Sequence, residues 1–234
     1  MFLSIIIPTF NEEVNIELLI KYIQQNVNST HYEIIVSDAE STDKTEEVAK
    51  KLDANFIISE KKGRAAQMNF GATVAKGDVY YFVHADNFPT PTFYSDIENA
   101  ILNQYNCGSF RFRFDTNRLI LKVNSFFTRF NYLYFRGGDQ TIFVTKDLFE
   151  KVGKFNDKML IMEDYDFLKR LFKIGKFKLV PKETIVSSRK YDKNSWLQVQ
   201  LANLKIVKMY NKGATQNEMV AMYGKMLNYR KNAF

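Results

Sequence analysis

Strands and helices are predicted to alternate three times within the first 86 residues, and this alternation limits the possible folds more than any other feature of the sequence. Short apolar runs at 3–7, 32–36 and 55–59 are typical of strands, and a predicted helix follows each of them. The third helix leads into residues 79–86, whose first five residues are apolar and indicate a strand buried on both faces. The pattern predicts right-handed strand–helix–strand units and an α/β fold, with a doubly wound, mostly parallel sheet flanked by helices.

The remaining elements follow from periodicity and from capping residues. Asn11 is predicted to cap the first helix, and Asp43 with Glu46 the second. Further helices are predicted at 91–103, 118–134 and 163–173, and further strands at 109–114, 141–145, 178–180 and 184–187. Two helices near 195–210 and 215–230 close the chain. In the first of these, Leu197, Leu201 and Leu204 form an apolar stripe over a basic face.

Charge is distributed unevenly along the chain. Residues 189–234 contain nine basic and two acidic residues, so they carry the whole net charge of +7, and the first 188 residues are neutral. We therefore expect a domain over 1–190 and a basic helical extension over 191–234 packed on the same domain. The extension favours an anionic partner, such as a membrane or a lipid-phosphate acceptor, with Trp196 and Tyr210 as interfacial candidates. A solvated basic face that maintains solubility is the alternative.

The composition of the chain indicates the cellular compartment in which the protein is expected. The single cysteine, Cys107, excludes an internal disulfide and suits a reducing environment. No apolar run approaches the roughly 18 residues of a membrane span, and the run at the start of the chain is too short for a signal peptide. We therefore expect a cytoplasmic protein, with the inner face of the membrane as a second location, and no nucleic-acid partner.

Polar residues follow four of the predicted strands. They are Thr9 and Glu12, then Asp38, then Lys62 and Arg64, and finally His84 and Asp86. Parallel topology brings these strand ends to one edge of the sheet, where α/β proteins bind ligands. Taken singly, each residue could serve only in a turn or as a helix cap. Their convergence favours a nucleotide-binding site, in which Asp38 would contact the base or ribose and the basic loop at 61–64 would contact a diphosphate.

The usual phosphate-binding loops are absent. The turn after the first strand begins with Pro8 and Thr9 and contains neither G-x-G-x-x-G nor a Walker loop. A metal on Asp86, together with the basic loop, could instead meet the charge of a diphosphate. Glu163 and Asp164 start a predicted helix, where an acid is by default a cap, although one of the two could serve as a general base. Arg189 could bind phosphate or lie on the surface.

These motifs together resemble the inverting family 2 glycosyltransferases with the GT-A fold. The matching segments, in chain order, are 5–13, 36–43, 63–69, His84-Ala85-Asp86, Gly138-Asp139-Gln140 and Met162-Glu163-Asp164. The resemblance runs over about residues 3–190. It is strongest to a bacterial subgroup of small, soluble members that carry His-Ala-Asp where most relatives have Asp-x-Asp.

The resemblance implies a nucleoside-diphosphate sugar donor, a UDP-sugar being favoured, and a divalent cation, Mn²⁺ or Mg²⁺. Asp164 matches the catalytic base, with Glu163 beside it, and Asp86 with His84 would hold the metal. The donor site would consist of Pro8, Thr9, Glu12, Asp38, Lys62, Arg64, Ala85 and Asp86. Further substrate contacts would come from Gly138, Asp139, Gln140 and Arg189. The acceptor is not implied, and a lipid-linked acceptor is one option.

The implied reaction is a single displacement in which a base activates an acceptor hydroxyl and the sugar is inverted. Two other classes remain open on the sequence. A nucleotidylyltransferase is expected to have a Gly-rich basic loop after the first strand, and this chain lacks such a loop. A non-catalytic nucleotide-sugar-binding protein could keep the sheet and Asp38 without needing Asp164.

Overall fold

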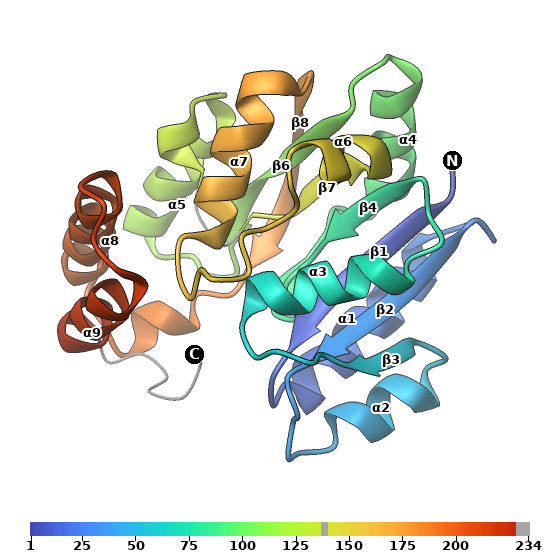
Figure 1. The fold of residues 1–234 in the computed structure, drawn as a ribbon, viewed down its shortest axis with the longest axis horizontal. Coiled ribbons are helices and arrows are strands. Elements are labelled where there is room, and N and C mark those ends of the chain that lie inside the picture. Colours follow the sequence, from blue (N-terminus) through green and yellow to red (C-terminus); the bar gives the residue numbers. More distant parts are fainter. Residues whose placement is uncertain (137–139, 228–234) are drawn as a thin grey trace.

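The structure, a computed structural model, describes residues 1–136 and 140–227. Within these residues one eight-stranded sheet has the order β3-β2-β1-β4-β7-β6-β8-β5 (Figure 1). The strands are β1 Leu3–Thr9, β2 Tyr32–Asp38, β3 Asn55–Ile58, β4 Val79–Phe82, β5 Asn87–Phe88, β6 Cys107–Phe114, β7 Ile142–Thr145 and β8 Phe177–Val186. The helices are α1 Glu13–Asn26, α2 Thr45–Lys51, α3 Arg64–Val74, α4 Phe93–Leu102, α5 Leu119–Phe126, α6 Lys146–Lys151, α7 Glu163–Ile174, α8 Trp196–Asn211 and α9 Gln216–Met226.

The sheet is parallel in its first half and mixed in its second. Strands β3, β2, β1 and β4 run parallel, as predicted. Strand β7 lies antiparallel to both β4 and β6, whereas β6 and β8 are parallel and β5 pairs antiparallel with β8. The α/β class with helices on both faces is therefore confirmed, and the parallel pairing holds the first four strand ends in register at one edge.

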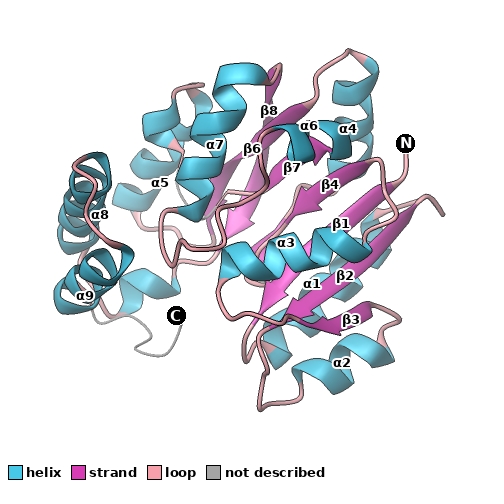
Figure 2. Ribbon diagram, viewed as in Figure 1, coloured by secondary structure: helices cyan, strands magenta, loops and turns pink. Residues whose placement is uncertain are grey.

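Each face of the sheet buries its own apolar cluster. Alternate residues of β1 explain the two layers, since Ile5 and Ile7 pack with α1 and α4, whereas Ile6 packs with α3 and α7. Successive side chains of a strand point to opposite faces, so a strand covered on both sides must be apolar throughout. Figure 2 shows α3, α6 and α7 in front of the sheet, with α1 behind it.

The predicted helix at 118–134 is interrupted. Helix α5 ends at Phe126, and two short 3₁₀ helices, Phe127–Arg129 and Leu133–Phe135, follow it. The Thr128 hydroxyl donates to the carbonyl of Ser125 and accepts from the backbone N–H of Phe112. This side-chain bonding competes with the helical ladder and ties the segment to β6.

Other local predictions are corrected by tertiary contacts. The two short strands predicted at 178–180 and 184–187 are one strand, β8, which bulges around Pro181 where its register with β6 shifts. Asn11 does not cap α1, because it has a positive φ and its side-chain oxygen Oδ1 accepts from the N–H of Thr42. Asp43 precedes the cap position of α2 and accepts from the N–H of Thr45. Strand β5 and helix α6 were not predicted.

Helices α8 and α9 pack on the body of the protein. Ile206 and Met219 lie in one cluster with Ile161, which precedes α7. The Gln216 side chain accepts from the N–H groups of Leu160 and Ile161. Among the described residues, no helix is both long enough and apolar enough to span a bilayer.

Candidate functional site

The ends of β1 and β2 carry a buried hydrogen-bonded cluster around Asp38. Thr9 and Asp38 are register partners, and the Thr9 hydroxyl donates to Asp38 Oδ2 at 2.7 Å. Ser41 donates from its N–H to Oδ1 and from its hydroxyl to Oδ2, both at 2.6 Å. By accepting these hydrogen bonds from Ser41, the Asp38 carboxylate fixes the loop that follows β2. Ser41, which the sequence analysis did not select, is part of this cluster.

Gln67 of α3 links the ends of the same two strands, β1 and β2. Its side-chain amide is buried and donates to the carbonyls of Thr9 and Ser37, at 2.7 and 2.8 Å. A buried glutamine among the small apolar residues of α3 was a visible signal in the sequence, since such a group is usually buried only when it is hydrogen-bonded. The sequence analysis gave it no role.

We expect Gln67→Leu to lower the free energy of unfolding by about 1–3 kcal/mol, because two buried carbonyls lose a donor. Chemical denaturation would measure this change. Gln25→Leu, at an exposed position on α1, is the control and should change stability by less than about 0.5 kcal/mol. Equal stability of the two variants would show that Gln67 does not hold the strand ends together.

Arg189 joins two acids from distant parts of the chain. It lies in a 3₁₀ helix, Arg189–Asp192, after β8. Its guanidinium donates to both carboxylate oxygens of Glu12, at 3.3 and 3.1 Å, and its Nη2 lies 2.7 Å from Oδ2 of Asp86. Glu12 is buried, so this two-pronged pairing compensates a charge that would otherwise be costly to desolvate. The structure thus brings Glu12, Asp86 and Arg189 together.

His84 faces the start of α7. Its Nε2 lies 3.5 Å from Oδ2 of Asp164, which has no hydrogen-bond partner among the described residues. Burial disfavours the imidazolium, but the neighbouring Asp164 carboxylate outweighs it and raises the pKa of His84. At 3.5 Å, the contact between His84 and Asp164 is long for a hydrogen bond.

Glu163 is buried beside Asp164 and faces Arg64 at the start of α3. Arg64 Nε lies 2.9 Å from Oε1 of Glu163, but the two groups are not aligned for a hydrogen bond. Burial raises the pKa of Glu163, the Arg64 charge opposes that rise, and the Asp164 charge adds to it. Both oxygens of Glu163 lack a hydrogen-bond donor within the described part of the chain. Buried carboxylate oxygens without donors are unusual and mark a place where a ligand or a proton is expected.

The other residues expected at the site lie in different surroundings. Lys62 is exposed and pairs with Glu40 at 2.9 Å, an interaction worth little, so its ammonium remains available to an anion. Pro8 is buried near the end of β1, and Ala85 is buried in the turn between β4 and β5. Gln140 is buried and bonded within its own segment, because it accepts from Arg136 and donates to the carbonyl of Phe135. Gly138 and Asp139 lie outside the described residues.

Asp86 and His84 offer few ligands for a metal. No group of three or more His, Cys, Asp or Glu side chains able to hold an ion occurs within residues 1–136 and 140–227. A cation that also binds a diphosphate needs only one or two protein groups, since phosphate oxygens and water complete its shell. Asp86, which is partly exposed, and His84, two residues before it in the chain, could hold such an ion, with the guanidinium of Arg189 competing for the Asp86 carboxylate.

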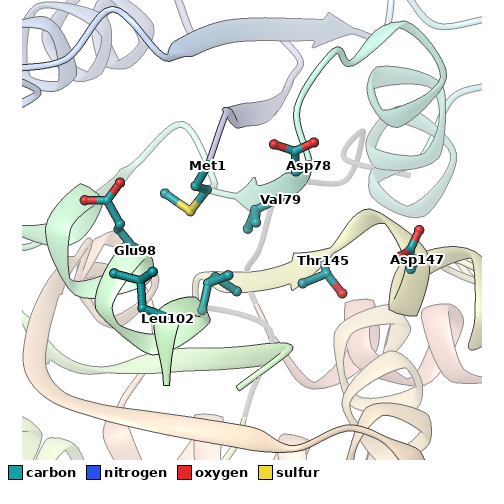
Figure 3. A pocket seen from close by; sticks show the side chains of 8 residues that line it. Met1, Asp78, Val79, Glu98, Leu102, Thr145 and Asp147 are labelled. Carbon is teal, nitrogen blue, oxygen red and sulfur yellow. The ribbon is translucent and has the colours of Figure 1, made fainter. Parts of the chain in front are cut away.

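A cavity of about 330 Å³ lies at the opposite edge of the sheet, at the start of β4. Figure 3 shows Asp78, Thr145 and Asp147 around it, together with Met1 from the start of the chain. None of the polar residues described above lines this cavity. It is therefore distinct from the candidate site.

The fold and the site define an α/β protein with acidic and basic groups gathered at the carboxyl edge of a parallel half-sheet. A profile of glycosyl transferase family 2 matches residues 4–163, which is more than half of the chain, and the chain belongs to this family. It is thus an enzyme of the family 2 glycosyltransferase type, as the sequence motifs indicated. The subgroup with His-Ala-Asp stays a prediction.

Individual relatives are more distant. The dolichol-phosphate mannosyltransferase of Pyrococcus furiosus is 33% identical over 108 residues, which cover 44% of this chain and 31% of that protein. The match thus spans about a third of the relative's length. Among solved structures, a Pyrobaculum calidifontis mannosyltransferase in complex with GDP-Man and Mn²⁺ superposes with a TM-score of 0.67 at 18% identity, covering 96% of this chain and 69% of that one.

A second solved structure, of S. aureus TarS in complex with UDP-GlcNAc, has a TM-score of 0.66 at 17% identity and covers 97% of this chain and 72% of the other. At this identity the likeness concerns the fold alone. It confirms the predicted GT-A architecture.

Proposed function

We propose that this protein transfers a sugar from a nucleoside-diphosphate sugar to an acceptor hydroxyl, with inversion and with Asp164 as the general base. The observation that carries the proposal is the buried Asp164 carboxylate, whose Oδ2 has no hydrogen-bond donor among the described residues. It lies at the start of α7, next to the strand end that bears His84 and Asp86. A proton acceptor beside a nucleotide-binding edge is what a direct displacement requires.

The donor would lie along the carboxyl edge of the parallel strands. We infer that the Thr9–Asp38 cluster holds the base and ribose, as in other α/β nucleotide sites. Lys62 and Arg64 would meet the diphosphate at the N-terminus of α3, where unpaired backbone N–H groups also favour anions. Relatives crystallised with UDP-GlcNAc and with GDP-Man support the donor class, and we favour a UDP-sugar.

The proposed displacement needs three groups of this chain. Asp164 accepts the proton of the acceptor hydroxyl while that oxygen forms a bond to the anomeric carbon. The bond from the anomeric carbon to the diphosphate breaks on the opposite face, and the electron pair leaves with the nucleoside diphosphate. Arg64 and Lys62 stabilise the negative charge that develops there.

A divalent cation would be held by Asp86, with His84 as a second ligand. When bound, Mn²⁺ or Mg²⁺ would neutralise the diphosphate and make it a better leaving group. A relative solved with Mn²⁺ supports the use of such an ion. We further propose that the acceptor is lipid-linked and is reached at the cytoplasmic face of a membrane, in line with the dolichol-phosphate specificity in the name of one relative.

We expect UDP with Mn²⁺ to stabilise the protein, because a ligand that binds only the native state raises its stability by mass action. At a hundredfold excess over Kd the gain is about 2.7 kcal/mol. A thermal-shift series of UDP, GDP and UDP-sugars, each with Mn²⁺ or with chelator, would measure it.

Slow hydrolysis of the stabilising donor in the absence of acceptor would then distinguish an enzyme from a protein that only binds the nucleotide sugar. Absence of stabilisation by every nucleotide, with and without metal, would contradict the proposed donor class.

A further inference from the structure

Helix α8 exposes an apolar stripe to solvent. Leu197, Leu201 and Leu204 recur at helical spacing and are 59%, 50% and 55% exposed. The opposite side of the helix faces the protein through three buried residues, Val199, Ala202 and Ile206. The leucine stripe predicted from the sequence therefore does not pack on the body of the protein.

Helix α5 exposes a second stripe. Leu119, Val123 and Phe126 are 76%, 48% and 46% exposed, and Phe130 continues the apolar surface beyond the end of the helix. Only Leu121 and Ser125 of this helix are buried. This helix buries only a narrow face and exposes several large apolar side chains to solvent. Exposed apolar surface of this extent is typical of a site that contacts a partner or a membrane.

The two stripes belong to neighbouring parts of the surface. Leu121 of α5 and Trp196 of α8 lie in the same apolar cluster. Arg118, just before α5, donates to the carbonyl of Tyr191 and pairs with Asp192 at 3.4 Å. Figure 1 shows both helices at the same end of the molecule. Of the seventeen large exposed apolar side chains within the described residues, eleven fall in segments 119–134 and 197–204.

The charge around these stripes is predominantly basic, with Asp192, which pairs with Arg118, as an acid at the edge of the surface. Segments 116–135 and 193–217 together contain seven basic residues and no acidic residue. The basic residues are Arg118, Lys122, Arg129, Lys193, Lys205, Lys208 and Lys212. Contact between two copies of this surface would oppose like charges, which disfavours self-association. Exposed apolar side chains that are flanked by Lys and Arg are typical of helices that lie in the interface of an anionic bilayer.

We propose that the α5/α8 surface, defined by these two segments, docks on the anionic surface of a lipid bilayer. Leu119, Val123 and Phe126 enter the interface from α5, and the three leucines enter from α8. The proposal replaces the anchors expected from the sequence, because Trp196 packs inward and the Tyr210 hydroxyl donates to Asp166. It does not depend on the reaction that the protein catalyses.

Co-sedimentation of the full chain with vesicles tests the proposal. We expect binding to vesicles of phosphatidylcholine mixed with phosphatidylglycerol, weaker binding to phosphatidylcholine alone, and weaker binding at high salt. The triple variant Leu197→Asn, Leu201→Asn, Leu204→Asn should lower the partition coefficient at least about tenfold. Replacing Lys205, Lys208 and Lys212 by Gln should lower it on anionic vesicles only.

The matched control replaces three apolar residues elsewhere that are at least as exposed on average, as Val14→Asn, Leu18→Asn and Leu102→Asn, and should bind like the wild type. Unchanged thermal unfolding of each variant shows that its fold is intact, as expected for exposed positions. Equal recovery of wild-type protein with neutral and anionic vesicles would overturn the proposal. So would a dimer in sedimentation equilibrium that the α8 variant dissociates, since a second copy would then cover the surface.

Discussion

Asp164→Asn is expected to reduce sugar transfer by about 10²–10⁴-fold while leaving the fold and donor binding intact. The amide has nearly the shape of the carboxylate but cannot accept the proton of the acceptor hydroxyl. The variant should stay folded, because the substitution is nearly isosteric and the interaction it removes is the 3.5 Å contact with His84. Steady-state kinetics should show the loss in kcat, with little change in the Kd of the nucleotide.

Two other variants make this result specific. Glu163→Gln should reduce transfer less, and more through substrate affinity than through turnover, because its carboxylate faces Arg64. Asp147→Asn alters an exposed acid in the first turn of α6, and its activity should equal that of the wild type. Near-normal turnover of Asp164→Asn with a verified acceptor would exclude this base, and Asp139 would be the next carboxylate to test.

Asp86→Ala is expected to abolish the effect of metal on nucleotide binding. In the wild type we expect UDP to bind at least about tenfold more tightly with Mn²⁺ than with chelator, a difference of about 1.4 kcal/mol. Without the carboxylate, the two affinities should be equal. The fold should persist, because Arg189 keeps its two hydrogen bonds to Glu12. Isothermal titration calorimetry with and without chelator would measure these affinities.

Asp78→Ala is the matched control, since Asp78 is an exposed acid at the opposite end of the same strand. Its variant should keep the full metal effect. Wild-type affinities that are equal with metal and with chelator would rule out the metal role of Asp86, while leaving the role of Asp164 as base to be tested separately.

The positions of most candidate residues were predictable, because they follow from strand ends. A strand buried on both faces is apolar throughout, so the first polar residue after it marks the sheet edge. This logic located Thr9, Asp38, His84 and Asp86 without a structure. It could not locate the contacts among them, since Arg189 and Glu12 are 177 positions apart and meet only because the end of β8 pairs with β5, the strand that directly follows Asp86.

Local periodicity also had limits. The segment 118–134 has helical composition, but the bonds of Thr128 to Ser125 and to Phe112 of β6 break the helix after Phe126. The antiparallel placement of β7 could not be foreseen either. Strand pairing depends on the path of the whole chain, and residues 142–145 carry no local signal for their direction.

The sequence by itself determined the elements of the parallel half-sheet, the order of the polar strand ends and the basic charge of the last two helices. Only the tertiary structure decided which face of α8 meets the protein. Leu197, Leu201 and Leu204 form one apolar stripe and Val199, Ala202 and Ile206 another, so periodicity alone fits either orientation. Packing turned the leucines outward, because Val199 and Ala202 lie in one cluster with Leu227 and residues of α9, and Ile206 lies in another with Ile161 and Met219.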